Sequence, residues 1–305
     1  MMKSFLFSTI LVAAFAWNAR ADRSEESRLC QKPLPRSPLI EKLKGDLPAE
    51  RELEVRVGPR VTETAGAFRL GSTALGAAFP GVGKDTVDTR RDLGMDEANV
   101  GMQFDLDWQF AKAWHLLFGY KYDQAEKTQT LPTDLSFDNA YFAKGSSFKT
   151  EVDLHQMDLT VGRDLHWDKT LKFMPFLGVK ALVAESEGTG TQTTVANPAN
   201  LGNAAGYATA PYHRSDRSWL VTWLAGFDAR VYVSRSWYWG ITPAFSALSD
   251  WWALQGQIYT GYDFSQEWGL RAGLDSLYGH YASEESNQMA DGGLGAVFIE
   301  AVWGF

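Results

Sequence analysis

The side chains in this sequence that could do chemistry include a histidine close to an acid and a serine. His213 and Asp216 stand three residues apart in YHRSDR, and Ser215 lies between them. A histidine beside a carboxylate can act as a general base in hydrolysis, and beside a serine it can activate a nucleophile. Such short spacings are common by chance in polar loops. We therefore expect no catalytic residue and a protein that is not an enzyme.

The acid-rich stretch KDTVDTRRDLGMDE is the other candidate for chemistry. Its aspartates could pair as acids in hydrolysis or bind Ca²⁺, and they are Asp85, Asp88, Asp92 and Asp96. The stretch lacks the ordered oxygen-ligand spacing of a dedicated calcium site. The five histidines of the sequence are scattered, and no two of them are two or four residues apart. The sequence therefore predicts no metal site and no cofactor.

The start of the chain predicts export. Residues 1–21 combine a basic Lys3, an apolar stretch and an Ala-Arg-Ala cleavage site, which is the pattern of a secretory signal peptide. Removing this segment takes the net charge from −8 to −10, which argues against nucleic acid as a partner. Cys30 is the single cysteine, so no internal disulfide can form. Residues 22–51 are polar and proline-rich, and we expect a flexible periplasmic tail.

From residue 52 onward, apolar residues recur at every second position, which is the period of a β-strand. In VGMQFDLDWQF, residues 100–110, apolar side chains alternate with Gly, Gln and Asp. The next alternating run, WHLLFGYKYD, begins after only three intervening residues. The two runs predict a tight antiparallel hairpin.

About ten such segments follow one another along the chain. We expect strands at residues 52–71, 98–110, 113–125, 148–166, 170–186, 215–234, 236–248, 252–264, 267–283 and 292–305. Short turns alternate with longer loops, which is the layout of a transmembrane barrel with periplasmic turns and outer loops. The predicted fold is an all-β, antiparallel up-and-down barrel over residues 52–305. An even number of strands in the outer membrane places both ends of the barrel on the periplasmic side.

Two features interrupt the alternation. Pro59 falls inside the first strand, which could split in two there. The fourth strand loses its phase near His155, which indicates either a bulge or the point where the strand leaves the membrane. Aromatic residues gather at both ends of the strands, as anchoring at two interfaces requires. They are Trp108, Trp114, Trp167, Trp237, Phe264, Trp268 and Phe305 at the turns, and Trp219, Trp251, Trp252 and Tyr281 at the loops.

The last nine residues, VFIEAVWGF, resemble a known class of protein. Val297, Ile299, Ala301, Trp303 and Phe305 form an alternating apolar stripe that ends on phenylalanine. This stripe resembles the terminal signature of bacterial outer-membrane barrel proteins, whose last strand is read by the barrel assembly machinery. The resemblance implies that Trp303 and Phe305 are an assembly signal, and that the partners are outer-membrane lipid and that machinery.

A second resemblance covers the stretch from Asp88 to Leu131. Its acidic DLG segment precedes the hairpin described above. This arrangement is similar to a group of small exported barrels without an assigned activity. The resemblance implies no functional residue.

The alternation also assigns a set of charged side chains to the barrel interior, or lumen. The set consists of Asp105, Asp107, His115, Lys121, Asp123, Asp158, Lys180, Asp228, Arg230, Arg271, Asp275 and Glu300. A barrel of about eight strands is filled by its own side chains, whereas an aqueous channel needs about sixteen. We therefore expect these charges to pair inside a closed lumen, and the alternative is a narrow polar path. Glu300, inside the last apolar strand, is expected to meet Arg271 or Arg56.

The function expected first is a non-enzymatic structural or surface role, exerted by a monomer through its outer loops. Residues 188–211 are rich in Gly, Ala, Thr and Asn, and we expect a flexible loop that contacts an extracellular partner. The second hypothesis is a narrow channel for ions or small solutes. The third is an outer-membrane hydrolase or acyltransferase, although no segment resembles the omptin proteases, which also have ten strands.

Overall fold

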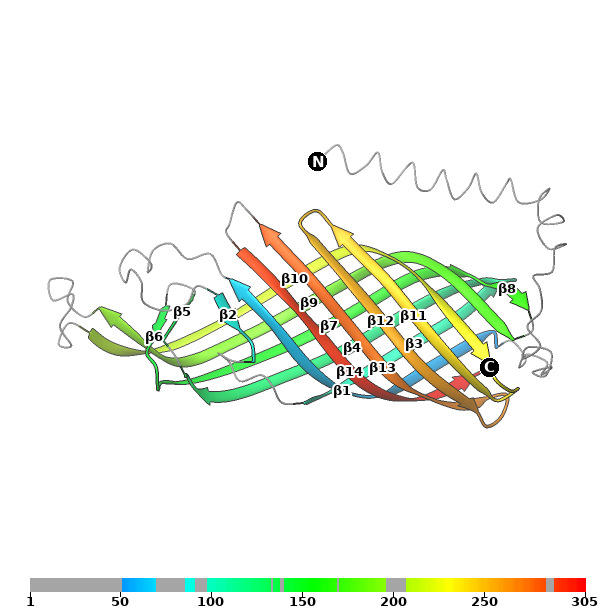
Figure 1. Cartoon of the computed structure of the whole chain (residues 1–305), viewed down its shortest axis with the longest axis horizontal. Coiled ribbons are helices and arrows are strands. Elements are labelled where there is room, and N and C mark those ends of the chain that lie inside the picture. The colour runs from blue at the N-terminus through cyan, green and yellow to red at the C-terminus, as the bar shows by residue number, and fades with distance from the viewer. Residues whose placement is uncertain are drawn as a thin grey trace. The chain divides into compact units, whose positions relative to one another are not determined.

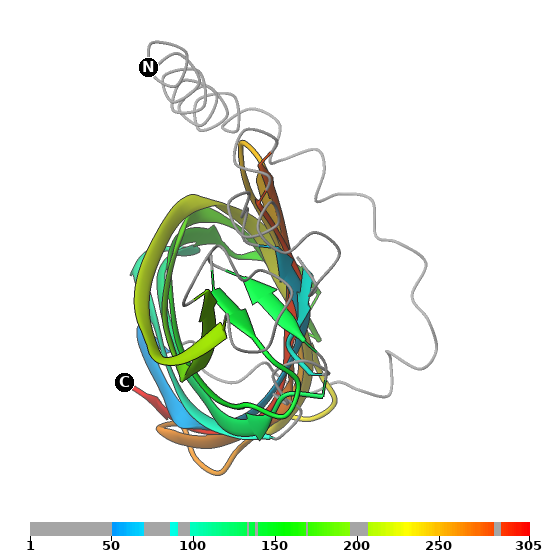
Figure 2. The same ribbon diagram turned by 90° about the vertical axis from the view of Figure 1, so that its left-hand side faces the viewer.

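The computed structural model describes residues 51–69, 86–90, 98–132, 134–137, 140–168, 170–195, 207–283 and 288–305. Ten long strands form one closed antiparallel ring, which confirms the predicted up-and-down barrel. They are β1 (Leu53–Arg69), β3 (Asn99–Ala111), β4 (Trp114–Thr130), β7 (Ser147–Arg163), β9 (Leu171–Val195), β10 (Tyr207–Tyr232), β11 (Trp237–Leu248), β12 (Trp251–Asp263), β13 (Trp268–Ser283) and β14 (Gln288–Gly304). Figure 2 shows the ring from one end. The described residues include no helix long and apolar enough to cross a membrane. The predicted signal peptide and the tail up to residue 50 lie outside the described residues.

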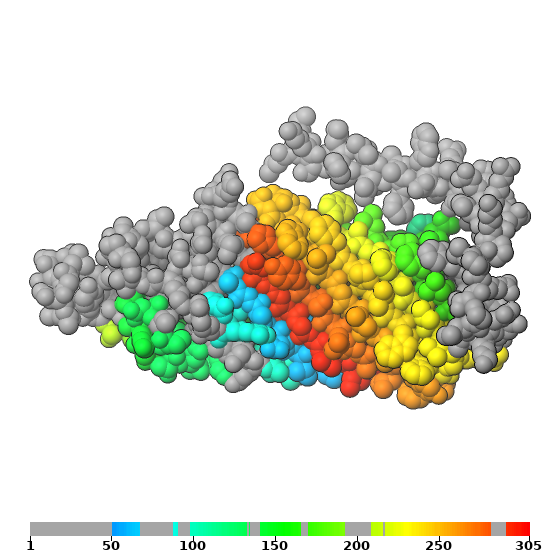
Figure 3. Space-filling view, viewed as in Figure 1, coloured from blue at the N-terminus to red at the C-terminus, as the bar shows by residue number. Residues whose placement is uncertain are grey.

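The ring closes where the last strand meets the first. In Figure 3 the blue atoms of β1 lie directly against the red atoms of β14, and the pairing runs from Glu54 opposite Gly304 to Arg69 opposite Met289. β1 does not split at Pro59, because it pairs with β14 in one register on both sides of that residue. Pro59 points outward, and Gly58 beside it allows a close approach of the two backbones: an added Cβ would lie 1.8 Å from the carbonyl oxygen of Ile299.

The two ends of the barrel differ. At one end, which we call the turn end, short connections join β3 to β4, β10 to β11 and β12 to β13, and the backbone of Phe305 bonds to that of Leu53. At the opposite end, the loop end, the chain adds the short strands β2 (Thr86–Asp88), β5 (Leu135–Phe137) and β6 (Ala140–Phe142). β8 (Leu165–Asp168) pairs with β9 near the turn end.

The outward face of the ring is apolar. Among the large apolar side chains on it, those with 45–58% exposure include Val221, Trp223, Trp239, Ile241, Phe245, Leu254, Ile258, Leu274, Val297 and Ile299. At the turn end, Trp268 stacks on Trp303 with ring centroids 5.4 Å apart, and Trp303 contacts Phe305. An apolar exterior with aromatic residues at the strand ends is the surface that a barrel presents to lipid.

Four strands continue well past the rest of the ring at the loop end (Figure 1). β9 has 25 residues and β10 has 26, whereas β11 has 12. A membrane-spanning strand needs only about 9–11 residues. We call the projecting parts of β4, β7, β9 and β10, residues 123–130, 147–154, 184–195 and 207–218, the outer wall. The expectation of a flexible loop at 188–211 is therefore wrong for residues 188–195 and 207–211, which belong to the wall. Residues 196–206 lie outside the described residues.

The outward face changes character where the wall begins. Tyr122, His155, Val183 and Trp219 lie side by side in one cross-strand row. In the next row toward the loop end, Gln124, Asp153, Glu185 and Arg217 take their places. The pairing through both rows is continuous, so β7 has no bulge at His155. The lost phase in the fourth strand instead marks the edge of the apolar surface.

The inward face of the outer wall mixes apolar and polar residues: Ala125, Phe148 and Val152 share it with Asp123, Lys127 and Thr150. The ring of Phe148 on β7 lies over Gly190 on β9, where an added Cβ would be 2.7 Å from it. Phe142, from the β5–β6 hairpin, is fully buried and meets Phe148 and Tyr212, each at a centroid distance of 5.0 Å. The glycines that suggested a loop thus make room for aromatic rings, and these rings fix the hairpin to the wall.

Candidate functional site: the charged lumen

A first group of charged side chains crosses the lumen toward the loop end. Lys121 of β4 donates to Asp275 of β13 at 2.6 Å, and three strands separate β4 from β13 by the shorter way round the ring. Arg60 of β1 also meets Asp275, at 3.1 Å, and Asp123 at 3.0 Å. Lys180 of β9 is fully buried and donates to Asp158 at 2.9 Å and to Gln255 of β12 at 2.8 Å. We call this group the loop-side layer: Arg60, Lys121, Asp123, Asp158, Lys180, Gln255 and Asp275.

A second group fills the lumen closer to the turn end. Glu54 of β1 lies 3.9 Å from Arg230 of β10, and four strands separate β1 from β10 in either direction round the ring. Arg230 donates to Asp228 at 2.7 Å, and Asp228 also accepts from Tyr259 and from Thr242. These residues belong to a group that we call the turn-side layer: Glu54, Arg56, Asp105, Asp228, Arg230, Tyr259, Arg271 and Glu300.

The centre of the turn-side layer is an arginine with several partners. Arg271 donates to Glu300 on the neighbouring strand and, at 3.3 Å, to Asp105 on β3. Its guanidinium group lies over the rings of Tyr259 and Phe298, at 4.5 and 5.3 Å from their centroids. Of the two partners expected for Glu300, Arg271 is the one that donates a hydrogen bond to it. Its carboxylate is fully buried inside the barrel.

A third group ties four chain segments together at the turn end. His115 of β4 places Nδ1 2.6 Å from Asp107 of β3, and Nε2 3.1 Å from Asp164, which follows β7. Lys172 of β9 lies 2.7 Å from the same Asp164. An imidazole that faces a carboxylate with each nitrogen satisfies both only when both nitrogens carry hydrogen. The group is therefore a chain of alternating charges, Asp107–His115–Asp164–Lys172, across the ends of neighbouring strands.

The structure places all twelve of the sequence-predicted lumen residues in these three groups. Ten of them are buried, and Asp105 and Asp158 keep side-chain exposures of 14% and 18%. Sequence reasoning missed Glu54, Arg60, Asp164 and Lys172. Glu54 and Arg60 follow the same period-two pattern, because they alternate with Leu53, Val55 and Val57. They were missed because Pro59 made the first strand uncertain. Asp164 lies in a turn, where alternation gives no information.

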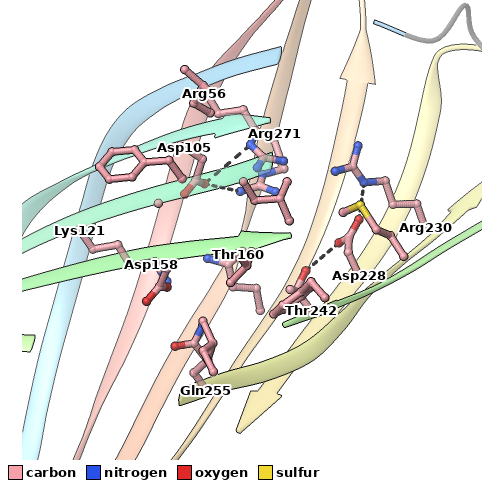
Figure 4. Close-up of a pocket in the computed structure, with 18 residues that line it drawn as sticks. Arg56, Asp105, Lys121, Asp158, Thr160, Asp228, Arg230, Thr242, Gln255 and Arg271 are labelled. Carbon is pink, nitrogen blue, oxygen red and sulfur yellow. Dashed lines mark hydrogen bonds and ion pairs between the residues drawn. The ribbon is translucent and has the colours of Figure 1, made fainter. Parts of the chain in front are cut away.

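A cavity of about 100 Å³ lies between the loop-side and turn-side layers (Figure 4). Its polar wall consists of Arg56, Asp105, Lys121, Asp158, Thr160, Asp228, Arg230, Thr242, Gln255, Gln257 and Arg271. Figure 4 shows Asp105 joined to Arg56 and Arg271 on one side and Asp228 joined to Arg230 and Thr242 on the other. The space fits a few water molecules, and paired charges stand on both sides of it along the barrel.

The candidates for catalysis do not converge in the described part of the chain. The His213 side chain is 65% exposed on the outward face of the wall, and its Nδ1 lies 3.6 Å from Glu187, which is too far for a hydrogen bond. Asp88 accepts from the backbone of Arg90. The side chain of Asp216, and Asp85, Asp92 and Asp96, lie outside the described residues. Among the described residues, no group of three or more potential ligands is placed to hold a metal ion.

A closed ring of ten strands with an apolar exterior and paired charges inside decides the class of fold. The fold is that of the bacterial outer-membrane β-barrels. No family model and no curated protein sequence matches the chain.

Solved structures that resemble the chain are outer-membrane barrels of low sequence identity. The outer membrane protease OmpT from Escherichia coli shares 8% identity with a TM-score of 0.48, over 83% of this chain and 96% of its own. The translocator domain of the autotransporter NalP from Neisseria meningitidis shares 9% with a TM-score of 0.42, over 95% and 98%. The toluene transporter TodX from P. putida shares 8% with a TM-score of 0.36, over 84% and 91%. The activities named for these three proteins differ from one another.

The Arg271–Glu300 pair makes a prediction for stability. Replacing Glu300 with Leu leaves Arg271 buried without its nearest carboxylate, and we expect a loss of about 3 kcal/mol in the free energy of unfolding. Adding Arg271→Met to the same chain removes the stranded charge, so the double variant should lose less than the sum of the two single changes. Urea unfolding of the protein in detergent micelles measures these values.

A matched control is the ion pair between Arg217 and Glu185 on the outward face of the wall. Their side chains are 71% and 45% exposed, with 3.2 Å between charged atoms. Exposed pairs contribute about 0–1 kcal/mol, so the equivalent substitutions there should change stability little. Equal losses at the two pairs would contradict the assignment of Arg271 and Glu300 to the interior.

Proposed function

We propose that this protein is a closed, non-enzymatic barrel of the bacterial outer membrane that presents its outer wall to the surroundings of the cell. The observation that carries the proposal is the set of polar contacts across the lumen: Glu54 to Arg230, Lys121 to Asp275, and Lys180 to Gln255. Each contact joins strands that are not neighbours in the ring. A lumen bridged at two levels supports a structural or surface role rather than transport.

The outer wall supports a surface role because its construction suits water and not lipid. Its outward face carries a mixture of charges from Lys149, Glu151, Glu185, Glu187 and Arg217. Its inward face carries the aromatic contacts of Phe148 and Tyr212. A sheet whose outward face is charged stands free of the bilayer and offers a folded surface to a partner. The extracellular partner that the sequence suggested at 188–211 is thus proposed to meet a folded sheet.

The same polarity supports an orientation for the barrel. The wall is proposed to lie outside the cell, and the turn end, with Trp303 and Phe305, in the periplasm. This orientation puts the start of β1 and Phe305 on the periplasmic side, together with the short turns, which are periplasmic in bacterial outer-membrane barrels. Recognition of Trp303 and Phe305 by the assembly machinery stays a prediction.

The proposal predicts that the barrel does not conduct. The purified protein, inserted in a planar lipid bilayer at pH 7 in molar KCl, should give no stepwise current, because paired charges occupy the lumen on both sides of the central cavity. The competing function is a narrow channel for ions or small solutes that runs through the central cavity. Reproducible single-channel steps from the folded protein at neutral pH would overturn the closed-barrel proposal in its favour.

Cysteine labelling tests the orientation. In a Cys30→Ser background, Ser215→Cys on the wall should react with a membrane-impermeant maleimide on intact cells, because the Ser215 side chain is exposed on β10. Ser265→Cys, in the exposed turn between β12 and β13, should react only after the outer membrane is permeabilised. The opposite pattern would invert the barrel and place the wall in the periplasm.

A further inference from the structure

The lumen holds its basic side chains in place with a small number of shared carboxylates. Asp275 forms ion pairs with both Lys121 of β4, at 2.6 Å, and Arg60 of β1, at 3.1 Å. Asp105 forms ion pairs with both Arg271, at 3.3 Å, and Arg56, at 3.7 Å. In both cases one acid separates two cations that reach it from different strands.

Glu54 repeats this arrangement at the edge of the turn-side layer. It meets Arg51 at 3.2 Å, Arg56 at 3.3 Å and Arg230 at 3.9 Å. Guanidinium groups cannot lose their charge in a protein, whereas a carboxylate loses its charge as soon as it is protonated. Acid therefore changes the charge of the carboxylates alone. Lowering the pH removes their negative charge and leaves the positive charge of the basic side chains in place.

We propose that neutralising these shared carboxylates converts the closed lumen into an anion-selective path. Removing the acid charge leaves cations facing one another, and like charges at short range in a partly dry interior repel. The long, flexible side chains then separate toward water, and the lumen that remains has a positive field. A channel lined by one sign of charge concentrates the opposite ion. This inference rests on the proposed function, because it takes the barrel to be closed at neutral pH.

The charges around the two central acids, Asp275 and Asp105, show how each layer responds to the loss of one carboxylate. Asp275 faces Gln257 of β12, Ala296 of β14, Arg60 of β1, Lys121 and Asp123 of β4, and Lys180 of β9. Asp105 faces Arg56 of β1, Gly119 of β4, Arg271 of β13 and Glu300 of β14. The loop-side layer has three basic groups and three acidic ones, so loss of the Asp275 charge leaves a positive excess there. The turn-side layer has three basic groups and four acidic ones, so loss of the Asp105 charge makes that layer neutral.

The experiment records current from the mature protein in a planar bilayer at pH 7 and at about pH 3, below the usual range in which Asp and Glu ionise. We expect a silent bilayer at pH 7 and small steps at the lower pH. In a KCl gradient the reversal potential of those steps should have the sign set by chloride. A folded barrel that stays silent at low pH, or steps selective for potassium, would overturn the inference and leave the closed-barrel proposal intact. Steps from the native protein at pH 7 would instead overturn that proposal.

Variants carry the same test at neutral pH. Asp275→Asn combined with Asp105→Asn neutralises one shared carboxylate in each layer and should give anion-selective steps at pH 7. Asp275→Asn combined with Glu54→Gln serves if the first pair fails to fold. The matched control is Asp153→Asn, because Asp153 lies on the outward face of the wall, where it accepts from Tyr122, and it should leave the bilayer silent. Migration of the unheated protein on a detergent gel verifies folding for every variant and pH. If the native barrel unfolds near pH 3, the neutral-pH variants decide, and folded but silent variants reject the inference.

Discussion

The structure depends on the pairing of charges that the barrel has withdrawn from water. An unpaired ion in such an interior costs several kcal/mol, so each inward-facing charge needs a partner of opposite sign at the right height. Lys121 finds Asp275, Arg271 finds Glu300, and His115 finds Asp107 and Asp164. Side chains face the lumen at every second position, so a slip of one residue in any strand would turn its charges toward lipid. The pairs therefore fix the register of the barrel as well as its closed interior.

The long strands pass from the lipid bilayer into water, and their outward side chains change accordingly. Within the apolar band, β7 and β9 direct apolar side chains outward and charged ones inward, as Leu159, Val179 and Lys180 illustrate. Past the row of Tyr122, His155 and Val183, the same strands direct charged side chains outward, while Phe148 of β7 packs on the inward face over Gly190 of β9. The backbone pairing does not change, because it is indifferent to which face meets lipid. Only the order of side chains changes, and this order marks where the bilayer ends.

The sequence predicted the barrel well because its two strongest signals are local. Period-two alternation located all ten long strands of the ring, and alternating connection lengths gave their order. Alternation failed past the apolar band: β9 continues through Gly188 and Gly190, which resemble a loop until the rings of Phe148 and Tyr212 are in place. The partners inside the lumen were also hidden, with the exception of Arg271 for Glu300. Alternation places a side chain on the inward face, but the pairing of Glu54 with Arg230 depends on how the ring closes.

The central claim is that ionic contacts cross the lumen and close it, and the Lys121–Asp275 pair tests it most directly. Three strands separate the two residues round the ring, so they touch only if they meet across the interior. A double-mutant cycle with Lys121→Met and Asp275→Leu, scored by urea unfolding, measures their interaction free energy. The account predicts a coupling of about 2 kcal/mol, as for contacting charged groups in one network. Additive losses, within about 0.5 kcal/mol, would show that the two side chains do not meet and that the lumen is open.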